Sequence, residues 1–354
     1  MIKHIFYGSQ EIVAAYLNNE LIYSATPAKF NPLSLFVNGE LGAWYEAVDA
    51  ATLFQDTALS TPATKAGDPI GATLDKSGND WHATQPISAR RPTYEQAPDR
   101  LQLDKADDEL VINMPSKFVG TMVLATTIGT ASYGVSIPAG DFKLGSRYFP
   151  SDDIVGVLLR DGALTDSEQE NTEGYFVENG AVADFSAVTD FGSFWFVQAH
   201  LTSFPLIDTS SATNFYNAWN SCSSLTSFPL IDTSSATNFS RAWSYCSSLT
   251  SFPLLDMSSV ESFYKAWFAC TSLTDLPAHA FDNVKSGRFN STFMQTNLNQ
   301  ESIDGILVSL VASGIADGAR QFDQSGGSAP SATGNQAIDT LRARGWAISV
   351  TGGY

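Results

Sequence analysis

Residues 201–224 read LTSFPLIDTSSATNFYNAWNSCSS, residues 225–248 read LTSFPLIDTSSATNFSRAWSYCSS, and residues 249–272 read LTSFPLLDMSSVESFYKAWFACTS. The period is 24 residues without slippage, and the first two copies differ at four positions. A half-copy precedes them in register, and a degenerate copy with two extra residues follows from Leu273. Because a unit this short cannot fold alone, the copies are expected to stack and bury their apolar sides against one another.

Within one copy the apolar pattern changes its period. Three residues near the start fit a short strand: Leu201, Phe204 and Leu206. Four later residues recur at i, i+3, i+4 and i+7, as on one face of a helix: Phe215, Ala218, Trp219 and Cys222. Side chains of residues 208–211 supply capping acceptors ahead of that helix. The pattern therefore predicts a strand, a capped turn and a helix of about three turns per copy, an α/β solenoid.

Composition restricts the functional classes. The chain has 354 residues, of which 44% are hydrophobic and 16% charged, enough apolar material for about two domains. Acidic residues (37) exceed basic ones (19), so the net charge is −18. This balance argues against nucleic-acid partners and anionic membranes. No apolar run approaches the ~20 residues that span a bilayer, and the N-terminus lacks the apolar core of a secretory signal.

The three cysteines occupy the same place in successive copies: Cys222, Cys246 and Cys270. Stacked copies would spread their sulfur atoms along the column at roughly 5 Å per step, whereas a metal needs ligands that converge on one point. Buried, free thiols are therefore expected. The four histidines are scattered through the chain: His4, His82, His200 and His279. No metal site, catalytic site or cofactor is predicted.

The positions that change between copies are candidates for binding. They are expected on the helix face opposite the buried stripe. One interpretation is a solvent-facing surface without a role; the other is a recognition surface, because aromatic and amide side chains suit stacking on sugar rings. Under the second interpretation the binding residues are Tyr216, Asn217, Asn220, Arg241, Tyr245, Tyr264, Lys265 and Phe268.

The cadence D-T-S-x-A-T-N-F-x-x-A-W-x-x-C-S-S-L-T-S-F resembles the BspA-like leucine-rich repeats of bacterial surface proteins and some phage proteins. That family places aromatic residues where Phe215 and Trp219 stand, and Cys-x-x-Leu where Cys222 and Leu225 stand. The resemblance covers roughly residues 184–297. It implies a binding or structural scaffold, because the family has no catalytic residues to transfer.

The segments before the repeats read as β-structure. Residues 1–26 form a hairpin pattern around Asn18-Asn19 and resemble short N-terminal modules of phage structural proteins. Residues 27–182 contain a lead-in (35–85) similar to that of phage virion proteins. They also contain two stretches, 100–113 and 153–180, that resemble concanavalin A-like (laminin-G-like) lectin domains. The short spacing between those stretches predicts a trimmed β-sandwich, and Thr165 to Glu168 is a capping box that starts a helix.

An acidic cluster lies within the second of these segments: Asp104, Asp107, Asp108 and Glu109. Calcium requires six to eight oxygen ligands, and the spacing matches no known calcium loop. A solvated turn is the plainer interpretation, and an inherited sugar or calcium site stays open.

The C-terminal segment, residues 298–354, is predicted to be an α/β cap. An apolar stripe from Ile303 to Val311 indicates one helix and residues 337–341 a second. Gly345 then stands at a C-cap position, and residues 346–351 read as a last strand. Such an atypical terminal unit shields the last apolar face of a stack from solvent.

Together these features predict a multidomain, β-rich plus α/β chain: an attachment module (1–26), a trimmed β-sandwich (27–182), a leucine-rich-repeat solenoid (183–297) and a cap (298–354). The resemblance implies a non-enzymatic phage virion appendage, a tail fibre or a capsid spike. Such a protein would be assembled in the host cytoplasm, with virion proteins, host-surface polysaccharide or protein, and further copies of itself as partners. A capsule-degrading glycosidase and a bacterial surface adhesin are the alternatives.

Overall fold

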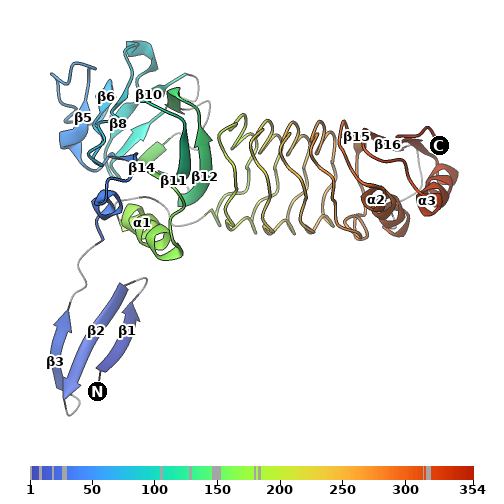
Figure 1. The fold of residues 1–354 in the computed structure, drawn as a ribbon, viewed down its shortest axis with the longest axis horizontal. Helices are drawn as coiled ribbons and strands as arrows, with labels where there is room; N and C mark the ends of the chain where they lie inside the picture. The colour runs from blue at the N-terminus through green and yellow to red at the C-terminus, as the bar shows by residue number, and fades with distance from the viewer. Residues whose placement is uncertain are drawn as a thin grey trace.

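The computed structural model describes residues 30–103, 107–126, 130–145, 153–178, 181, 185–313, 315 and 320–354, together with the backbone of three N-terminal strands. The chain is β-rich, with several antiparallel sheets and few helices (Figure 1). The N-terminal strands form an antiparallel sheet in sequence order: β1 (Ile2–Tyr7), β2 (Gln10–Leu17) and β3 (Glu20–Ala25). The strands predicted for residues 1–26 are thus present, and their turn residues lie outside the described part.

Two further antiparallel sheets share one apolar core. The first has the order β13-β10-β7-β6-β5, made of β5 (Leu53–Phe54), β6 (Ala72–Thr73), β7 (Ala83–Thr84), β10 (Glu109–Met114) and β13 (Gly140–Gly145). The second has the order β12-β11-β14-β9-β8, with β4 also paired to β14, and is made of β4 (Gly42–Glu46), β8 (Thr93–Glu95), β9 (Arg100–Gln102), β11 (Phe118–Thr126), β12 (Thr130–Ile137) and β14 (Asp153–Asp161). Three short 3-10 helices lie in the same part of the chain: η1 (Pro32–Phe36) before β4, η2 (Ala50–Thr52) between β4 and β5, and η3 (Ser88–Arg90) between β7 and β8.

Helix α1 (Asp166–Glu178) covers the outer face of the second sheet. Phe176 packs over Gly156 so closely that a Cβ atom there would lie 2.1 Å from the phenyl ring. The predicted capping box starts this helix: the Thr165 N–H donates to Glu168 Oε2 (2.8 Å), and the Glu168 N–H donates to Thr165 Oγ1 (3.3 Å).

Residues 185–288 run as stacked coils that are visible as parallel loops in Figure 1. The coils are joined by backbone hydrogen bonds such as Trp219 N–H to Ala242 O (2.8 Å) and Trp243 N–H to Ala266 O (2.9 Å). Parallel bridges recur every 24 residues, from Asp190 through Asn214 and Asn238 to Ser262. Within these described residues the backbone forms isolated bridges and turns, but neither a helix nor an extended strand. The predicted strand-and-helix unit is therefore wrong.

The reason lies in where the backbone N–H groups point. Alternate N–H groups donate to carbonyls of the next coil: those of Phe215, Asn217, Trp219 and Ser221. The groups between them donate three residues back within their own coil: those of Ala218, Asn220 and Cys222. Asn217 and Ser221 adopt positive φ (57° and 66°) to permit this alternation. A neighbouring coil thus replaces the i to i−4 bonds that a helix would make.

The centre of the stack is a column of aromatic rings. The indoles of Trp195, Trp219, Trp243 and Trp267 lie parallel, with centroids 5.3, 5.4 and 5.3 Å apart. All four side chains are almost fully buried. The three cysteines are buried and free, as predicted, and each Sγ lies within 3.1 Å of the carbonyl oxygen of a Trp in the preceding coil. Every copy therefore contributes the same side chains to one continuous core.

The short strand expected at Leu201, Phe204 and Leu206 is also absent, and these three side chains do not share one environment. Leu201 and Phe204 are buried, but Leu206 is 72% exposed, and its equivalents Leu230 and Leu254 are exposed too. Since no strand forms here, side chains do not alternate between two faces.

The stack is continuous with the β-structure before it. Tyr133 of β12 accepts a hydrogen bond from Trp195 Nε1 (3.3 Å), and Val135 forms a bridge with Leu201. One apolar core therefore crosses the expected boundary at residue 183.

A small parallel sheet, β15-β16-β17, with two helices follows the last coil: β15 (Phe289–Met294), α2 (Gln300–Ala312), β16 (Arg320–Ser325), α3 (Ala332–Ala343) and β17 (Trp346–Ser349). Both predicted helices and the last strand are present, and Gly345 after α3 has φ 90°. β15 begins before the expected boundary at residue 298, because Phe293 stacks on Trp267 (5.1 Å, 8°) and extends the aromatic column.

Candidate binding face

The largest gathering of the predicted binding residues lies on the outer surface of the second and third complete coils. Five of them meet there with one further cation, and we call this set the aromatic–cation face: Arg241, Tyr245, Tyr264, Lys265, Phe268 and Arg288. The remaining predicted residues do not join them. Tyr216 is exposed on the preceding coil, whereas Asn220 is 7% exposed and donates to the Asn217 side chain (3.2 Å).

The expectation that every varying position faces solvent is therefore wrong. Ser244 and Ala269 are buried, in addition to Asn220. These side chains turn toward the neighbouring coil, as in the hydrogen bond from Ser244 Oγ to the Lys265 carbonyl (2.5 Å). The alternating backbone pattern, rather than a helical face, decides which side chains point outward.

Three cations surround one phenol ring in this face. The Arg241 guanidinium lies 5.7 Å from the centroid of Tyr264, Lys265 Nζ lies 5.4 Å from it, and the Arg288 guanidinium lies 4.9 Å from it. Lys265 Nζ is also 4.9 Å from the Phe268 ring, which meets Tyr245 edge-on at 5.4 Å. Each contact falls within the range of a cation–π or aromatic pair.

The register of the coils brings these side chains together. The Arg241 N–H donates to the Tyr264 carbonyl (2.8 Å), and the Lys265 N–H donates to the Asn290 carbonyl (3.1 Å). Arg241 and Lys265 both adopt positive φ, 58° and 56°. Equivalent residues thus sit directly above one another, so a cation 24 residues from another cation becomes its neighbour in space.

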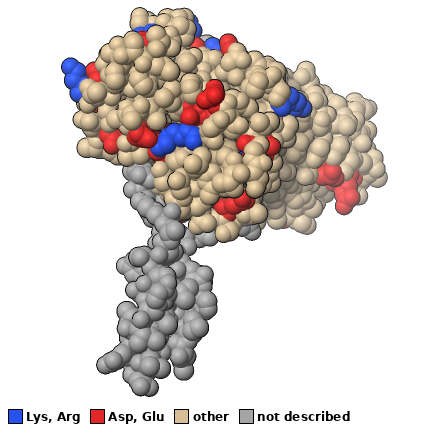
Figure 2. Space-filling view, turned by 60° about the vertical axis from the view of Figure 1, so that its left-hand side comes forward, with Lys and Arg blue, Asp and Glu red and all other residues tan. Residues whose placement is uncertain are grey.

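The face is electropositive in a chain of net charge −18. Within the described ranges, none of the three cations is ion-paired with a carboxylate. Hydrogen bonding from Arg241, followed by the charge of Lys265, lowers the pKa of the Tyr264 phenol. Charged side chains are sparse elsewhere too: Figure 2 shows one side of the molecule, where acidic and basic groups form small, scattered clusters on a largely neutral surface.

Arg288 was missed by the sequence analysis. It belongs to the degenerate fourth copy, whose two extra residues shift the 24-residue register. Phe289, 26 residues after Phe263, is the equivalent of that residue in the fourth copy. Aligning the two phenylalanines would have placed Arg288 in the coil. Its guanidinium is further held by a hydrogen bond from Nε to Asn290 Oδ1 (3.3 Å).

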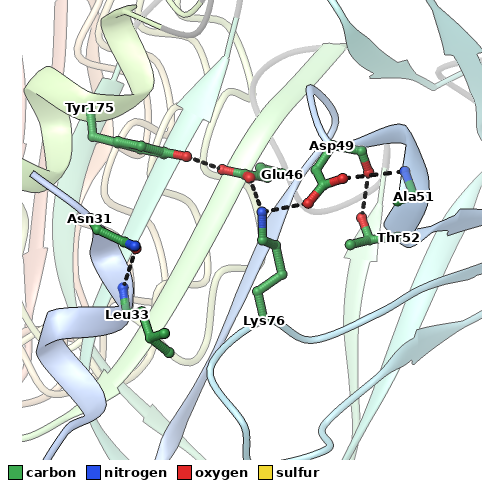
Figure 3. A network of polar contacts seen from close by, with 8 residues as sticks. All are labelled: Asn31, Leu33, Glu46, Asp49, Ala51, Thr52, Lys76 and Tyr175. Atoms are coloured by element: carbon green, nitrogen blue, oxygen red, sulfur yellow. Dashed lines mark hydrogen bonds and ion pairs between the residues drawn. The ribbon is translucent and has the colours of Figure 1, made fainter. Parts of the chain in front are cut away.

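A second polar cluster lies between β4, α1 and the loop that carries Lys76 (Figure 3). Glu46 is 4% exposed and accepts hydrogen bonds from Lys76 Nζ and from the Tyr175 hydroxyl (2.7 Å). Lys76 also donates to Asp49 (2.7 Å) and lies 4.5 Å above the Trp44 ring. Burial, together with Glu46, raises the pKa of Tyr175. Because these groups satisfy one another, the cluster fastens α1 to β4.

The acidic cluster of residues 104–109 is tied to basic side chains. Asp107 pairs with Arg90 (3.2 Å), and Glu109 pairs with Lys143 (3.1 Å); Asp104 lies outside the described residues. Asp108 is 7% exposed, so the turn is not fully solvated as expected. In the described part of the chain, no group of three or more His, Cys, Asp or Glu side chains could hold a metal.

The described histidines lie in separate parts of the fold. His82 Nδ1 faces the backbone N–H of Asp75 (3.2 Å), and His200 packs edge-on against Phe142, where burial lowers its pKa. His279 pairs with Asp282 (2.8 Å) in a hollow of about 590 Å³ beside the third coil.

In the described part of the chain, no helix has both the length and the apolar character needed to cross a membrane. None of the family models, curated proteins or solved structures compared with the chain matches it. The candidate site therefore rests on the chemistry of the aromatic–cation face alone.

Proposed function

We propose that the chain is a non-enzymatic structural and adhesion component of a bacteriophage virion, a tail fibre or a head spike. The observation that carries the adhesive part is the aromatic–cation face. There the exposed ring of Tyr245, two half-buried rings and three cations without an ion pair among the described residues gather on one side of the coils. Such a surface suits recognition of a host-surface glycan or protein better than chemistry on a small substrate. The virion assignment rests on the resemblances of residues 1–26, 35–85 and 184–297.

We further propose that the coils are a solenoid of the BspA-like repeat type, preceded by a trimmed concanavalin A-like domain. The hydrogen bonds from Trp219 to Ala242 and from Trp243 to Ala266, spaced by one repeat, support the solenoid. Two antiparallel sheets over one core support the sandwich. In this arrangement the N-terminal module attaches to other virion proteins, and the coils project toward the host. A symmetric homo-oligomer is part of the proposal.

Electron microscopy of particles released by the producing bacterium tests the location. A gold-labelled antibody against the full chain should mark the tail or the head surface. Label on the bacterial envelope instead would assign the chain to the surface adhesins and overturn the virion proposal.

The adhesive role has its own test. Purified full-length protein is incubated with capsular polysaccharide of the host, and both retention and reducing ends are measured. Retention without new reducing ends is expected. Release of reducing ends would identify a depolymerase and contradict the non-enzymatic assignment.

A further inference from the structure

We infer that the aromatic–cation face binds an acidic polysaccharide, whose sugar rings lie against the exposed aromatic rings while a carboxylate or sulfate sits among Arg241, Lys265 and Arg288. The inference rests on the proposed adhesive function and deepens it by naming the ligand class.

The first support is the absence of internal counter-ions at these three cations within the described residues. Elsewhere in the structure, cations such as Lys76, Arg100 and Lys143 lie within 4 Å of carboxylates. An acidic chain has many carboxylates with which it could neutralise three clustered cations, yet here it places aromatic rings between them. The hydrogen bond from Arg241 and, after it, the charge of Lys265 lower the pKa of the Tyr264 phenol. A site of this kind is completed by an external anion.

The second support is the arrangement of the rings. Tyr245 is 51% exposed and Tyr216 is 39% exposed, so both offer ring surface to a ligand. Tyr216 and Tyr264 hold equivalent places two coils apart. The stacked indoles show that successive coils repeat every 5.3–5.4 Å. A polymer that extends along the stack can therefore meet both the aromatic–cation face and the ring of Tyr216 on the preceding coil, which a single sugar could not do.

The charge of the whole chain selects among polymeric anions. A densely charged polymer such as nucleic acid would be repelled by a protein of net charge −18 wherever it left the three cations. A polysaccharide carries its charges farther apart, with neutral ring surface between them that suits aromatic stacking. An acidic peptide offers the charges without those rings. The observations therefore favour an acidic polysaccharide over the other two.

The test compares R241Q/K265Q with the matched variant K117Q/K285Q. Both remove two positive charges, but Lys117 and Lys285 are exposed and lie outside the aromatic–cation face. Binding of the full-length protein is measured by affinity electrophoresis in gels containing polygalacturonate, dextran sulfate, neutral dextran or polyglutamate. Circular dichroism melting verifies that both variants fold.

The wild type and K117Q/K285Q should be retarded by polygalacturonate, by dextran sulfate or by both, and the two polymers show whether carboxylate or sulfate is preferred. R241Q/K265Q should bind at least about tenfold more weakly, a change of about 1.4 kcal/mol. A third variant, Y264L, keeps the charges and should also weaken binding.

Three results would overturn the inference. They are an equal loss of glycan binding in the two double variants, binding of polyglutamate as strong as that of the acidic glycans, and no retardation of the wild type by either acidic glycan. Adsorption to host cells separates it from the proposed function. If R241Q/K265Q binds the acidic glycans in the gels as the wild type does, and both proteins adsorb to host cells, the acidic-glycan site is refuted while the adhesive role stands.

Discussion

Replacing Trp243 with alanine tests the stacked core directly. The indole is fully buried between Trp219 and Trp267, with centroids at 5.4 and 5.3 Å, and the rings of Phe228 and Phe252 meet it edge-on at 5.3 and 4.7 Å. Burial of this kind predicts a loss of about 3–5 kcal/mol in the free energy of unfolding. The upper part of that range is expected, because the coils on both sides are fixed by backbone hydrogen bonds and cannot close the cavity.

The variant W243F serves as the comparison. The Trp243 Nε1 atom is buried without a hydrogen-bond partner in the described structure, which carries a desolvation penalty of about 1–3 kcal/mol. Phenylalanine removes that group and keeps most of the ring contacts, so W243F should lose only about 1–2 kcal/mol. Y245A, on the exposed surface of the same coil, should change stability by about 0.5 kcal/mol or less.

Urea unfolding followed by far-ultraviolet circular dichroism measures these differences, because the fluorescence of a tryptophan variant is not comparable. The transition midpoint and slope are both recorded, since a repeat array can unfold in more than one step. A loss below about 1 kcal/mol for W243A, or equal losses for W243A and W243F, would refute the stacked core.

Three further predictions concern other parts of the chain. Burial raises the pKa of Cys246 to about 12, so thiol reagents at pH 8 should label the folded chain slowly and the unfolded chain fully. Because a thiol in the unfolded chain ionises near pH 8.5, the free energy of unfolding should also fall as pH rises above that value. T165A should cost about 1 kcal/mol, measured by urea unfolding, with T165S as the control. The capping box should contribute to the free energy of unfolding above about pH 4.3, and this contribution should be lost as pH falls. The reason is that hydrogen bonds from Thr165 lower the pKa of Glu168 in the folded chain. Y175F should lose about 1–2 kcal/mol, since Glu46 remains paired with Lys76, and an unchanged midpoint would contradict the proposed clamp on α1.

The burial pattern of the repeats could be predicted from sequence, but their backbone could not. Phe215, Ala218, Trp219 and Cys222 are all fully buried, as their spacing predicts. The same spacing fits a helix, which explains the wrong assignment. What decides between them is the neighbouring coil, which accepts hydrogen bonds from every second N–H group. One copy of the sequence does not contain that partner. Only the strict 24-residue period indicates that it exists.

The candidate site could be predicted in part, for a related reason. In a stack of equal coils, a substitution in one copy stands beside the equivalent residue of the next copy, so comparing copies identifies neighbours in space. That comparison found Arg241 and Lys265, one period apart, and Tyr264 beside them. It failed for Asn220, because whether a side chain points outward depends on the alternating backbone. It also failed for Arg288, because two inserted residues shift the register of the last copy. The two extra residues are accommodated before Phe289, which stacks on Phe263 (4.9 Å), so Arg288 takes the place in its coil that Ser262 holds in the third copy and lies over the ring of Tyr264. The register of the phenylalanines, rather than the number of residues between them, thus completes the aromatic–cation face. Deleting the two extra residues should therefore leave Arg288 beside Arg241 and Lys265, as long as Phe289 stays stacked on Phe263.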